Sequence, residues 1–492
     1  MLRRTVRPAL IGVLSAGLGL AAAELLAAAT RPAAGPLVAV GGAVIDATPT
    51  PVKEFAVRTL GTYDKPVLLG SIALVLVLFT AVVGVLTTRR RSVAIAGAAV
   101  FGLAGAAAAL SRPASNGFDA VPSLLGAVIA GGVLTMWSRS RSASQDRRAF
   151  LRTALLVTGG AVLTGGAAET VKRVRGGAVA KSREAIALPA AADPARPLPG
   201  GVAPGFYSDK LYRVDTALSV PTVDVGAWSL RIHGKVRREL TLSFDDLLRR
   251  PLIERDITLN CVSNEVGGPY IGTVRWLGVP LAPLLAELGV DPAADQLVAR
   301  SVEGMTIGTP VATVLDGRDA MLCVGMNGEP LPLEHGFPVR MLTPGLYGYA
   351  GACKWLTELE LTTFAAFDAY WVRRGWAARG PVKTASRIDK PQPFARVGAG
   401  KVTVAGVAWA QGRGIRGVEV RVDDRPWQKA ELLPVPSSDT WVQWRYEWAA
   451  TPGPHTLAVR ATDGTGAVQP AERATPFPDG ATGWHTITAT VD

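Results

Sequence analysis

Five apolar runs dominate the first third of the chain. They lie at about residues 9–29, 67–86, 93–110, 121–137 and 150–168. A helix that crosses a bilayer needs about 20 predominantly apolar residues, and each run approaches that length. Runs rich in Ala, Gly and Leu also occur as buried helices of soluble domains, but five in succession with short polar loops favour membrane spans. The pattern predicts five transmembrane helices within residues 1–170.

Arginines stand at the ends of these runs. They precede the first run, separate the second from the third, and separate the fourth from the fifth: Arg3, Arg4, Arg7, Arg89 to Arg91, Arg139, Arg141, Arg147 and Arg148. Basic loops stay on the cytoplasmic side of a membrane. Five crossings from a cytoplasmic start place everything after residue 170 outside the cytoplasm, as part of a multi-pass protein of the cell membrane.

The fifth run carries a second signal. Arg147 and Arg148 are followed by Phe150, Leu151 and an apolar stretch, which resembles a twin-arginine export signal. Such a signal implies that the domain after it folds, and acquires a cofactor, in the cytoplasm. The alternative is that both arginines are ordinary cytoplasmic-side charges.

Beyond the apolar region, the pattern changes to short alternating runs. Residues 171–205 are rich in Ala, Pro, Gly and basic residues without sustained periodicity, which indicates a linker. Residues 206–390 mix β-like runs with two helical ones, "LSFDDLLRRP" and "VPLAPLLAELGV". Ser243 and Asp246 match a capping box in the first, and Gly289 ends the second. Strands outnumber helices without regular alternation, which predicts an α+β domain.

The last part of the chain, residues 391–492, is different again. Alternating runs such as "KVTVAGVAWA" and "WVQWRYEWAA" are broken by Gly, Pro and Asp, at spacings typical of a β-sandwich. We therefore expect a multidomain protein with N-terminal all-α transmembrane helices, an α+β domain, and an all-β immunoglobulin-like sandwich.

Composition narrows the functional classes. The formal net charge is +12, but many arginines flank the apolar runs, so no nucleic-acid partner is predicted. The three cysteines, Cys261, Cys323 and Cys353, are far apart and form neither a disulfide framework nor a CxxC metal pair. The four histidines lie outside the apolar runs and no CxxCH motif occurs, so no haem is predicted in this chain.

Cys261 lies in "TLNCVSNEVGG", between a β-like run and a pair of glycines. A thiolate at the end of a strand is a natural ligand for a soft metal, and glycines allow another group to approach the backbone closely. A lone cysteine is also often packed as a small apolar side chain. On these residues alone both interpretations stay open.

Downstream, "EHGFPVRMLTPGLYGYAGACKWL" gathers polar side chains in loops. His335, Arg340 and Lys354 are donors that suit a phosphate or another polar cofactor. Taken singly, His335 also fits a turn histidine bonded to backbone, and Arg340 fits a structural ion pair. Their density within one short stretch favours the cofactor interpretation.

Several motifs occur together along the chain. Cys261 is followed by Asn264, and then come "MNGEPLP", "HGFPVR", "PG" at Pro344 and Gly345, and "KWL". With these motifs, residues 206–390 resemble the sulfite oxidase family of molybdopterin-dependent oxidoreductases. Residues 391–492 are similar to the immunoglobulin-like dimerisation domain of that family.

The resemblance implies one Mo-molybdopterin cofactor. Cys261 Sγ would bind molybdenum beside the dithiolene sulfurs, and His335 and Arg340 would bind the pterin or its phosphate. The remaining implied cofactor contacts are Arg213, Asp215, Thr216, Thr306, Ala352, Cys353 and Lys354.

Two positions depart from the family pattern. Asp215 stands where sulfite oxidases carry an arginine that binds sulfite, and Trp376 stands where they carry an active-site tyrosine. An acidic side chain repels the sulfite anion. We expect Asp215 and Trp376 to serve with Cys261 in the catalytic site, acting on a substrate other than sulfite.

The resulting hypothesis is a membrane-anchored, molybdenum-dependent oxidoreductase that performs two-electron oxo-transfer chemistry on a small molecule outside the cytoplasm. A separate electron carrier or membrane redox partner is expected, because no second redox centre is visible in this sequence. The similarity of the last domain implies a homodimer. The alternatives are a reductase of sulfoxide-type substrates and a non-catalytic envelope binding protein that retains the fold.

Overall fold

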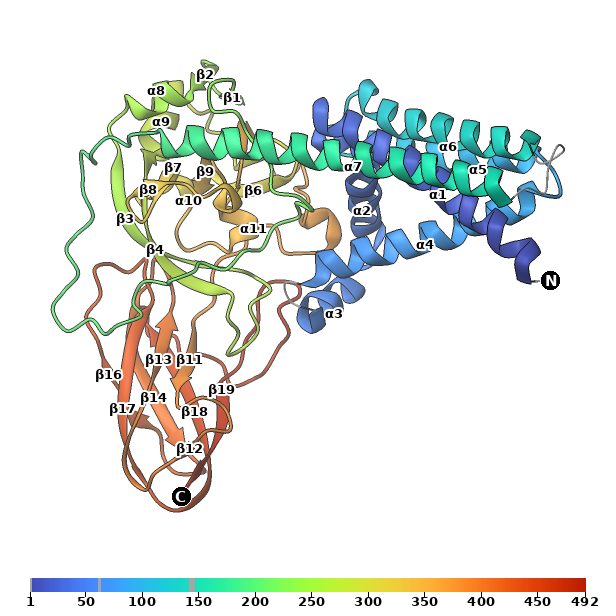
Figure 1. The fold of residues 1–492 in the computed structure, drawn as a ribbon. Helices are drawn as coiled ribbons and strands as arrows, with labels where there is room; N and C mark the ends of the chain where they lie inside the picture. The colour runs from blue at the N-terminus through green and yellow to red at the C-terminus, as the bar shows by residue number, and fades with distance from the viewer. Residues whose placement is uncertain (1, 61–62, 141–146) are drawn as a thin grey trace. The chain divides into compact units, whose positions relative to one another are not determined.

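The computed structural model describes residues 2–60, 63–140 and 147–492. Contacts divide the chain into two units (Figure 1). The first comprises Met1–Lys181 with Thr216–Thr222, and the second comprises Ser182–Asp215 with Val223–Asp492. The first unit is helical and the second is rich in sheet, which confirms the predicted order of a helical region followed by a sheet-rich region.

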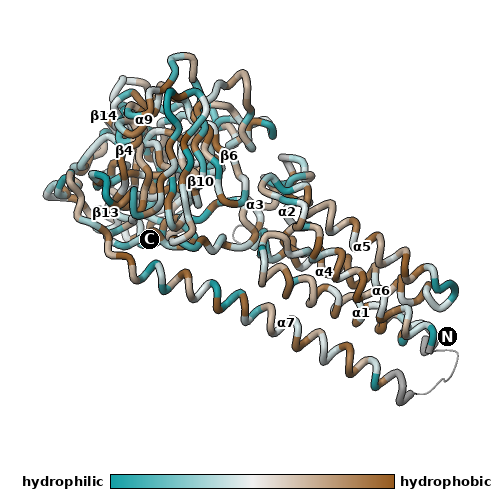
Figure 2. Tube along the Cα trace, turned by 90° about the horizontal axis from the view of Figure 1, so that it is seen from above, coloured by the Kyte–Doolittle hydropathy of each residue, from teal (hydrophilic) through white to brown (hydrophobic). Residues whose placement is uncertain are grey.

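Five helices in the described part of the first unit are long and apolar enough to cross a membrane. They belong to α1 (Leu2–Ala29), α4 (Asp64–Thr87), α5 (Ser92–Leu110), α6 (Val121–Ser140) and α7 (Arg147–Glu184). Figure 2 shows hydrophobic residues along α1, α4, α5 and α6. These are the five apolar runs predicted from the sequence.

Small residues bring these helices together. A Cβ added to Gly12 in α1 would lie 2.9 Å from Gly84 Cα in α4, and one added to Gly126 in α6 would lie 2.7 Å from the Gly19 carbonyl oxygen in α1. Glycines at such crossings let two backbones approach as closely as helices in membranes commonly do.

The expected loop between the first two apolar runs contains two further helices. They are α2 (Pro36–Ala47) and α3 (Thr50–Leu60). With 12 residues, α2 is apolar but too short to span a bilayer, so a search for long runs missed it. An ion pair of 2.6 Å between Arg112 and Asp46 joins the end of α2 to the segment after α5.

The expected linker is helical in its first part, because α7 continues to Glu184. Residues 171–184 therefore correct the predicted boundary. The segment is rich in Ala, Lys, Arg and Glu, which are good helix formers, and Lys172 pairs with Glu24 at 3.0 Å. Arg141 and the side chains of Arg147 and Arg148 lie outside the described residues.

The first half of the sheet-rich unit contains two sheets and short helices. One sheet has the order β2 (Leu240–Ser243), β1 (Ser229–Gly234), β10 (Leu356–Thr362), β5 (Gln296–Ser301) and β6 (Thr306–Pro310). The other has the order β3 (Ile253–Asn260), β4 (Ile271–Pro280), β7 (Met321–Met326) and β8 (Glu329–Pro330), with β9 (Arg340–Leu342) beside β7. The short helices are α8 (Phe244–Leu248), α9 (Leu281–Leu288), α10 (Val311–Val314) and α11 (Gly348–Gly351).

Both predicted helix signals in this half are confirmed. Ser243 and Asp246 form the capping box of α8, and Gly289 follows α9 with φ of 68°. Residues of both sheets and of α8 and α9 share one apolar core, which includes Leu230, Leu285 and Leu359.

The last part of the chain forms two further sheets. One has the order β11 (Ala385–Lys390), β13 (Gly400–Trp409), β17 (Val442–Ala450) and β16 (Glu431–Leu432). The other has the order β12 (Arg396–Val397), β19 (His485–Val491), β18 (Gly453–Asp463), β14 (Ile415–Val422) and β15 (Gln428–Lys429). Alternate side chains of both sheets form one core, which includes Trp444 and Val459.

The start of this last part differs from the predicted residue 391. β11 pairs along its length with β13, so the C-terminal sheets begin at Ala385. The boundary between the two parts is therefore set by the pairing of two strands that are separated along the chain. The immunoglobulin-like assignment stays a prediction.

Candidate active site

Cys261 follows the last residue of β3 and is 8% exposed. Its N–H donates to the Tyr270 carbonyl oxygen at 3.0 Å, and its own carbonyl oxygen accepts from Asn264 N–H at 3.0 Å. Asn264 Oδ1 accepts from Tyr270 N–H at 2.8 Å. These bonds hold the thiol at the end of a rigid strand.

Electrostatics at Cys261 suit a metal ligand. Burial raises the pKa of the Cys261 thiol, and hydrogen bonds from Ser263 and the charge of Lys354 lower it in part. A coordinated metal cation removes the thiol proton outright. The free thiol is therefore neutral near pH 7, whereas a metal would hold it as thiolate.

His335 and Arg340 meet across a left-handed glycine. Gly336 has φ of 112°, and a Cβ there would lie 3.1 Å from Lys354 Cα and 3.2 Å from Arg340 Cβ. Glycine adopts this conformation without strain and leaves room for both neighbours. Arg340 Nη1 donates to the His335 carbonyl oxygen at 3.2 Å, so "HGFPVR" gathers its two polar side chains into one place.

A carboxylate links two more basic residues to this place. Asp215 Oδ2 lies 2.9 Å from Lys354 Nζ and 2.9 Å from Arg213 Nε. Lys354 Nζ also donates to the Glu334 carbonyl oxygen at 3.0 Å. The structure thus brings together Arg213, Asp215 and Lys354, three of the residues expected to contact the cofactor.

Burial, and secondarily the neighbouring positive charges, lower the pKa values of His335 and Lys354. Burial lowers the pKa of His335 to about 3, and the charges of Arg340 and Lys354 contribute. Burial likewise lowers the pKa of Lys354 to about 8, against the opposing charge of Asp215. His335 is therefore neutral at pH 7, with one ring nitrogen able to donate and the other to accept.

Several buried polar atoms near Arg340 lack a partner within the described part of the chain. They are His335 Nδ1, Arg340 Nε and Thr343 Oγ1. Arg340 is 3% exposed, and none of the described residues forms an ion pair with it. Because an uncompensated buried charge is strongly unfavourable, this group of residues fits an anionic, hydrogen-bonding ligand such as a phosphate.

Other predicted cofactor contacts have backbone roles in the structure. Thr306 Oγ1 accepts from the Tyr370 N–H at 2.9 Å, and Ala352 N–H donates to the Gly348 carbonyl oxygen at 3.0 Å. Cys353 is buried, and burial raises the pKa of its thiol to about 12. Thr216 starts the segment that groups with the helical unit.

Trp376 lies in an aromatic cluster. Its ring centroid is 5.4 Å from that of Phe477, 5.9 Å from Tyr349 and 6.3 Å from Trp371. The same buried cluster includes Val262, the residue after Cys261. Trp376 therefore forms part of an apolar wall beside the Cys261 loop.

Two residues that lie near these candidate site residues, Tyr212 and Thr343, were not predicted from the sequence. Tyr212 is half-buried, and burial of its phenol raises its pKa well above the usual range, with the nearby Cys261 raising it further and Arg340 lowering it. Its position directly before Arg213 was the available signal in the sequence. Thr343 directly follows β9, so it lies beside the segment that carries Arg340.

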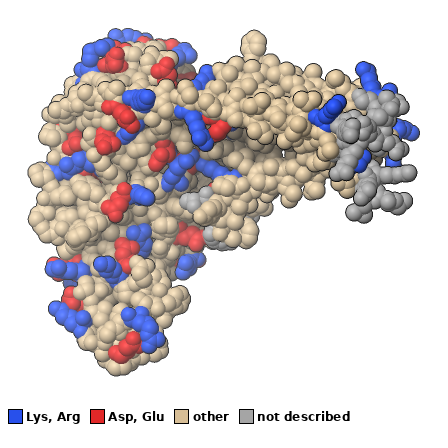
Figure 3. Space-filling model, in the orientation of Figure 1, with Lys and Arg blue, Asp and Glu red and all other residues tan. Residues whose placement is uncertain are grey.

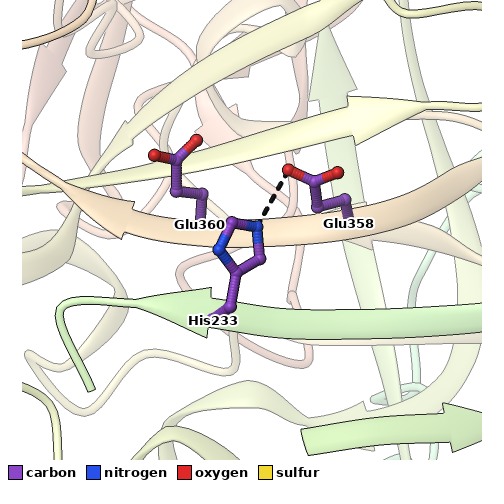
Figure 4. A group of neighbouring side chains, drawn as sticks. All are labelled: His233, Glu358 and Glu360. Atoms are coloured by element: carbon purple, nitrogen blue, oxygen red, sulfur yellow. Dashed lines mark hydrogen bonds and ion pairs between the residues drawn. The ribbon is translucent and has the colours of Figure 1, made fainter. Parts of the chain in front are cut away.

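A separate polar group lies on the sheet formed by β1, β10 and β5. Figure 4 shows His233, Glu358 and Glu360, with His233 Nε2 2.9 Å from Glu358 Oε1. The ligand atoms are close enough together for a metal ion. Arg300, however, pairs with Glu358 at 2.9 Å and with Glu360 at 2.6 Å. The carboxylates are already compensated, so we interpret this group as an ion-pair network.

The residues around Cys261 lie in a part of the chain that is similar to known proteins. The family model described as "Oxidoreductase molybdopterin binding domain" matches residues 217–371, a range that contains Cys261, His335, Arg340 and Lys354. Mitochondrial sulfite oxidase of Mus musculus is 30% identical over 282 residues, which are 48% of this chain and 51% of that protein.

Two further relatives extend this comparison. The uncharacterized oxidoreductase YuiH of Bacillus subtilis is 32% identical over 157 residues, which are 32% of this chain and 76% of that protein. The crystal structure of the sulfane dehydrogenase SoxCD from Paracoccus pantotrophus matches with a TM-score of 0.49 and 25% identity, covering 56% of this chain and 80% of that one. The chain spans about half the length of the first curated relatives it matches. The family predicted from the motifs is confirmed: this chain belongs to the sulfite oxidase-like family of molybdopterin-dependent oxidoreductases.

Proposed function

We propose that this chain holds one Mo-molybdopterin through Cys261, His335, Arg340 and Lys354, and that it catalyses two-electron oxo-transfer chemistry on a small molecule. The strongest support is Arg340, a buried guanidinium without a carboxylate partner among the described residues. A cofactor phosphate would supply the missing negative charge through charge-assisted hydrogen bonds.

The residues of this chain have distinct parts in that function. When bound, the molybdenum centre supplies two-electron redox chemistry coupled to oxygen-atom transfer. Cys261 Sγ provides the thiolate ligand at the end of β3, and neutral His335 offers its unpartnered Nδ1. Asp215 holds Lys354 in place through the 2.9 Å ion pair, so that the ammonium group is oriented before the cofactor binds.

The same ion pairs argue for an uncharged substrate. Asp215 pairs with both Arg213 and Lys354, so its carboxylate offsets positive charge that would otherwise attract an anionic substrate such as sulfite. Trp376 adds an apolar wall beside the Cys261 loop. We therefore propose a neutral substrate, a class that includes sulfoxides and thioethers.

Metal and pterin analysis of the full chain, purified in detergent, tests the proposed function. We expect about one molybdenum and one pterin per chain, because the site offers one thiolate and one group of phosphate-binding donors. The loaded protein should turn over a neutral sulfoxide with a reduced dye faster than it oxidises sulfite with an oxidised dye. Protein that contains neither metal nor pterin when made in a cofactor-producing host would contradict the proposal.

We further propose that the five apolar helices anchor the chain in the cell membrane and that the sheet-rich unit lies outside the cytoplasm. Figure 3 shows few charged side chains over the middle of the helical unit and a basic group near its N-terminal end. An apolar belt bounded by basic residues is the arrangement that membrane proteins adopt. A separate electron carrier and a homodimer remain part of the proposal.

A reporter fused after Asp492 measures this orientation. We expect alkaline phosphatase activity from the fusion, because that enzyme is active only outside the cytoplasm. Replacing Arg147 and Arg148 by lysine should block export of the reporter if the twin-arginine signal is used. The matched control replaces Arg89 and Arg90 by lysine, which keeps the cytoplasmic charge and should leave export intact. Unchanged export in the first variant would eliminate the twin-arginine interpretation.

A further inference from the structure

The Cys261 loop comprises residues 261–270 and connects β3 to β4, which pair with each other along their full length. Hydrogen bonds of Tyr270 with Cys261 and Asn264 close the base of this loop. The loop contains turns but neither helix nor strand. A segment of this kind is mobile unless neighbouring parts of the fold hold it, so the position of Cys261 depends on what packs against the loop and against the end of β3.

The C-terminal part of the unit holds the end of β3. This strand lies at the edge of its sheet, and an edge strand presents backbone groups that its own sheet leaves unpaired. Three residues before Cys261, Thr258 N–H donates to the Asp439 carbonyl oxygen at 2.9 Å, and the Thr258 carbonyl oxygen accepts from Gln411 Nε2 at 3.1 Å. Thr258 Oγ1 accepts from Trp441 N–H at 2.7 Å. The last part of the chain therefore fixes the strand that carries Cys261.

Two residues of the C-terminal sheets hold the far end of the Cys261 loop. Arg387 in β11 donates from Nη1 to the Gly268 carbonyl oxygen at 2.8 Å. His485, the first residue of β19, packs its ring against Gly267 so closely that a Cβ on Gly267 would overlap the ring. Contacts from the last part of the chain thus lie on both sides of Cys261 along the sequence, at Thr258 and at residues 267–268.

Both of these side chains are themselves held in place. Arg387 Nε donates to Asp389 Oδ1 at 2.6 Å, and Ile388 N–H donates to His485 Nδ1 at 2.9 Å. Burial lowers the pKa of His485 to about 4, and the charge of Arg387 contributes. The ring is therefore neutral at pH 7, so Nδ1 can accept this hydrogen bond.

We propose that Arg387 and His485 are positioning residues for Cys261: they hold the far end of the Cys261 loop, so that the Cys261 side chain keeps one orientation. This inference rests on the proposed function, in which Cys261 Sγ is the metal ligand. Replacing a residue that supports a metal ligand without touching the metal typically costs about 10–100-fold in metal affinity or activity. The C-terminal sheets thereby supply part of the support of the reaction centre.

The first experiment labels the cysteines of the cofactor-free full chain in detergent with a thiol reagent and follows each cysteine by mass spectrometry. Cys261 is 8% exposed and Cys323 is fully buried, so labelling of Cys323 reports general unfolding. We expect the ratio of Cys261 to Cys323 labelling to rise about tenfold in Arg387→Met, because the loss of a hydrogen bond from a charged donor favours local opening by at least about that factor.

His485→Asn is a second variant of the same contact. Asparagine keeps an acceptor for the Ile388 N–H and removes the outer atoms of the ring that packs against Gly267. We expect the same direction of change in the labelling ratio as for Arg387→Met. If Arg387→Met does not fold, His485→Asn decides the outcome.

Arg413→Met is the matched control. Arg413 pairs at 3.0 Å with Asp463, whose side chain is 3% exposed, and its other hydrogen bonds within the described part of the chain go to Val382 and Thr384. The variant leaves a buried carboxylate without this partner, so it should lower the thermal stability of the protein. The ratio of Cys261 to Cys323 labelling should stay as in the wild type, because Arg413 does not bond to the Cys261 loop.

The second experiment uses the full chain loaded with cofactor. In Arg387→Met we expect a shifted molybdenum–thiolate absorption band and about tenfold lower kcat, with KM within about twofold of the wild type and unchanged molybdenum content. A wild-type labelling ratio in both loop variants, an equal rise in Arg413→Met, or an unshifted band in loaded Arg387→Met would refute the positioning role. Absence of molybdenum from the wild type would instead refute the proposed function, and the labelling ratios would still decide whether Arg387 and His485 hold the loop.

Discussion

Replacing Cys261 by serine should abolish the molybdenum–thiolate absorption and lower the turnover of the loaded protein by more than about 100-fold. Loss of a residue that merely supports a metal ligand typically costs 10–100-fold, so loss of the ligand itself should cost more. The backbone bonds that hold Cys261 to Tyr270 and Asn264 do not involve the thiol, so the variant should keep its fold. Absorption spectroscopy, metal analysis and turnover with the same dye assay measure these effects.

Cys323→Ser is the matched control. Cys323 is fully buried in β7, and burial raises the pKa of its thiol to about 12. These are the properties of a thiol that packs in the core as a small apolar group. The change places a hydroxyl in an apolar setting and should cost some stability, while the absorption band stays intact. If Cys261→Ser retained the thiolate band, or if Cys323→Ser lost it, the assignment of Cys261 as the metal ligand would be wrong.

Replacing Arg340 by methionine should have opposite effects on the empty and the loaded protein. In the cofactor-free protein, Arg340 is a buried charge that lacks an ion pair among the described residues, so an apolar side chain of similar length should keep or raise the thermal stability. In the loaded protein, the loss of hydrogen bonds to a charged phosphate should cost about 1.5–3 kcal/mol, which weakens cofactor retention by about 10–150-fold. Thermal unfolding and pterin fluorescence measure the two effects.

Arg275→Met is the comparison variant, because Arg275 is a half-buried arginine that does have a carboxylate partner. Arg275 pairs at 2.9 Å with Asp256, whose side chain is 2% exposed. Its removal leaves a buried carboxylate uncompensated, which typically costs 3–5 kcal/mol. We expect Arg275→Met to lower the stability of the cofactor-free protein. If Arg340→Met destabilised the empty protein to the same extent, Arg340 would be a structural residue and would lose its proposed role.

Much of the secondary structure followed from local patterns. The five apolar helices, the capping box at Ser243 and the glycine stop at Gly289 depend only on residues within one or two helical turns. The two exceptions have different explanations. α2 is an apolar helix shorter than a membrane span, and the end of α7 is a polar helix whose Glu24–Lys172 pair involves a distant segment.

The sequence pointed to some of the candidate site residues and not to others. Cys261, His335, Arg340 and Lys354 were proposed because their motifs are short and distinctive, and Asp215 was proposed as a departure from the family pattern; their roles stay predictions. Tyr212 and Thr343 were not predicted: the neighbouring Arg213 was the one local signal for Tyr212, and a threonine in an extended segment carries no local sign of what it will face. Asp215 was also expected to act as a free repelling charge, whereas its carboxylate is engaged by Arg213 and Lys354.

The sequence by itself determined the apolar spans, the strands, and the residue types that could bind a molybdenum cofactor, because periodicity and motifs depend on neighbours along the chain. Only the tertiary structure decided which charges are paired. Lys354 and Asp215 are 139 residues apart and meet because β10 and the segment before β1 pack in one unit. Arg340 is left without a carboxylate partner among the described residues for the same reason: the partner of a buried polar group is set by which distant segments fold against each other.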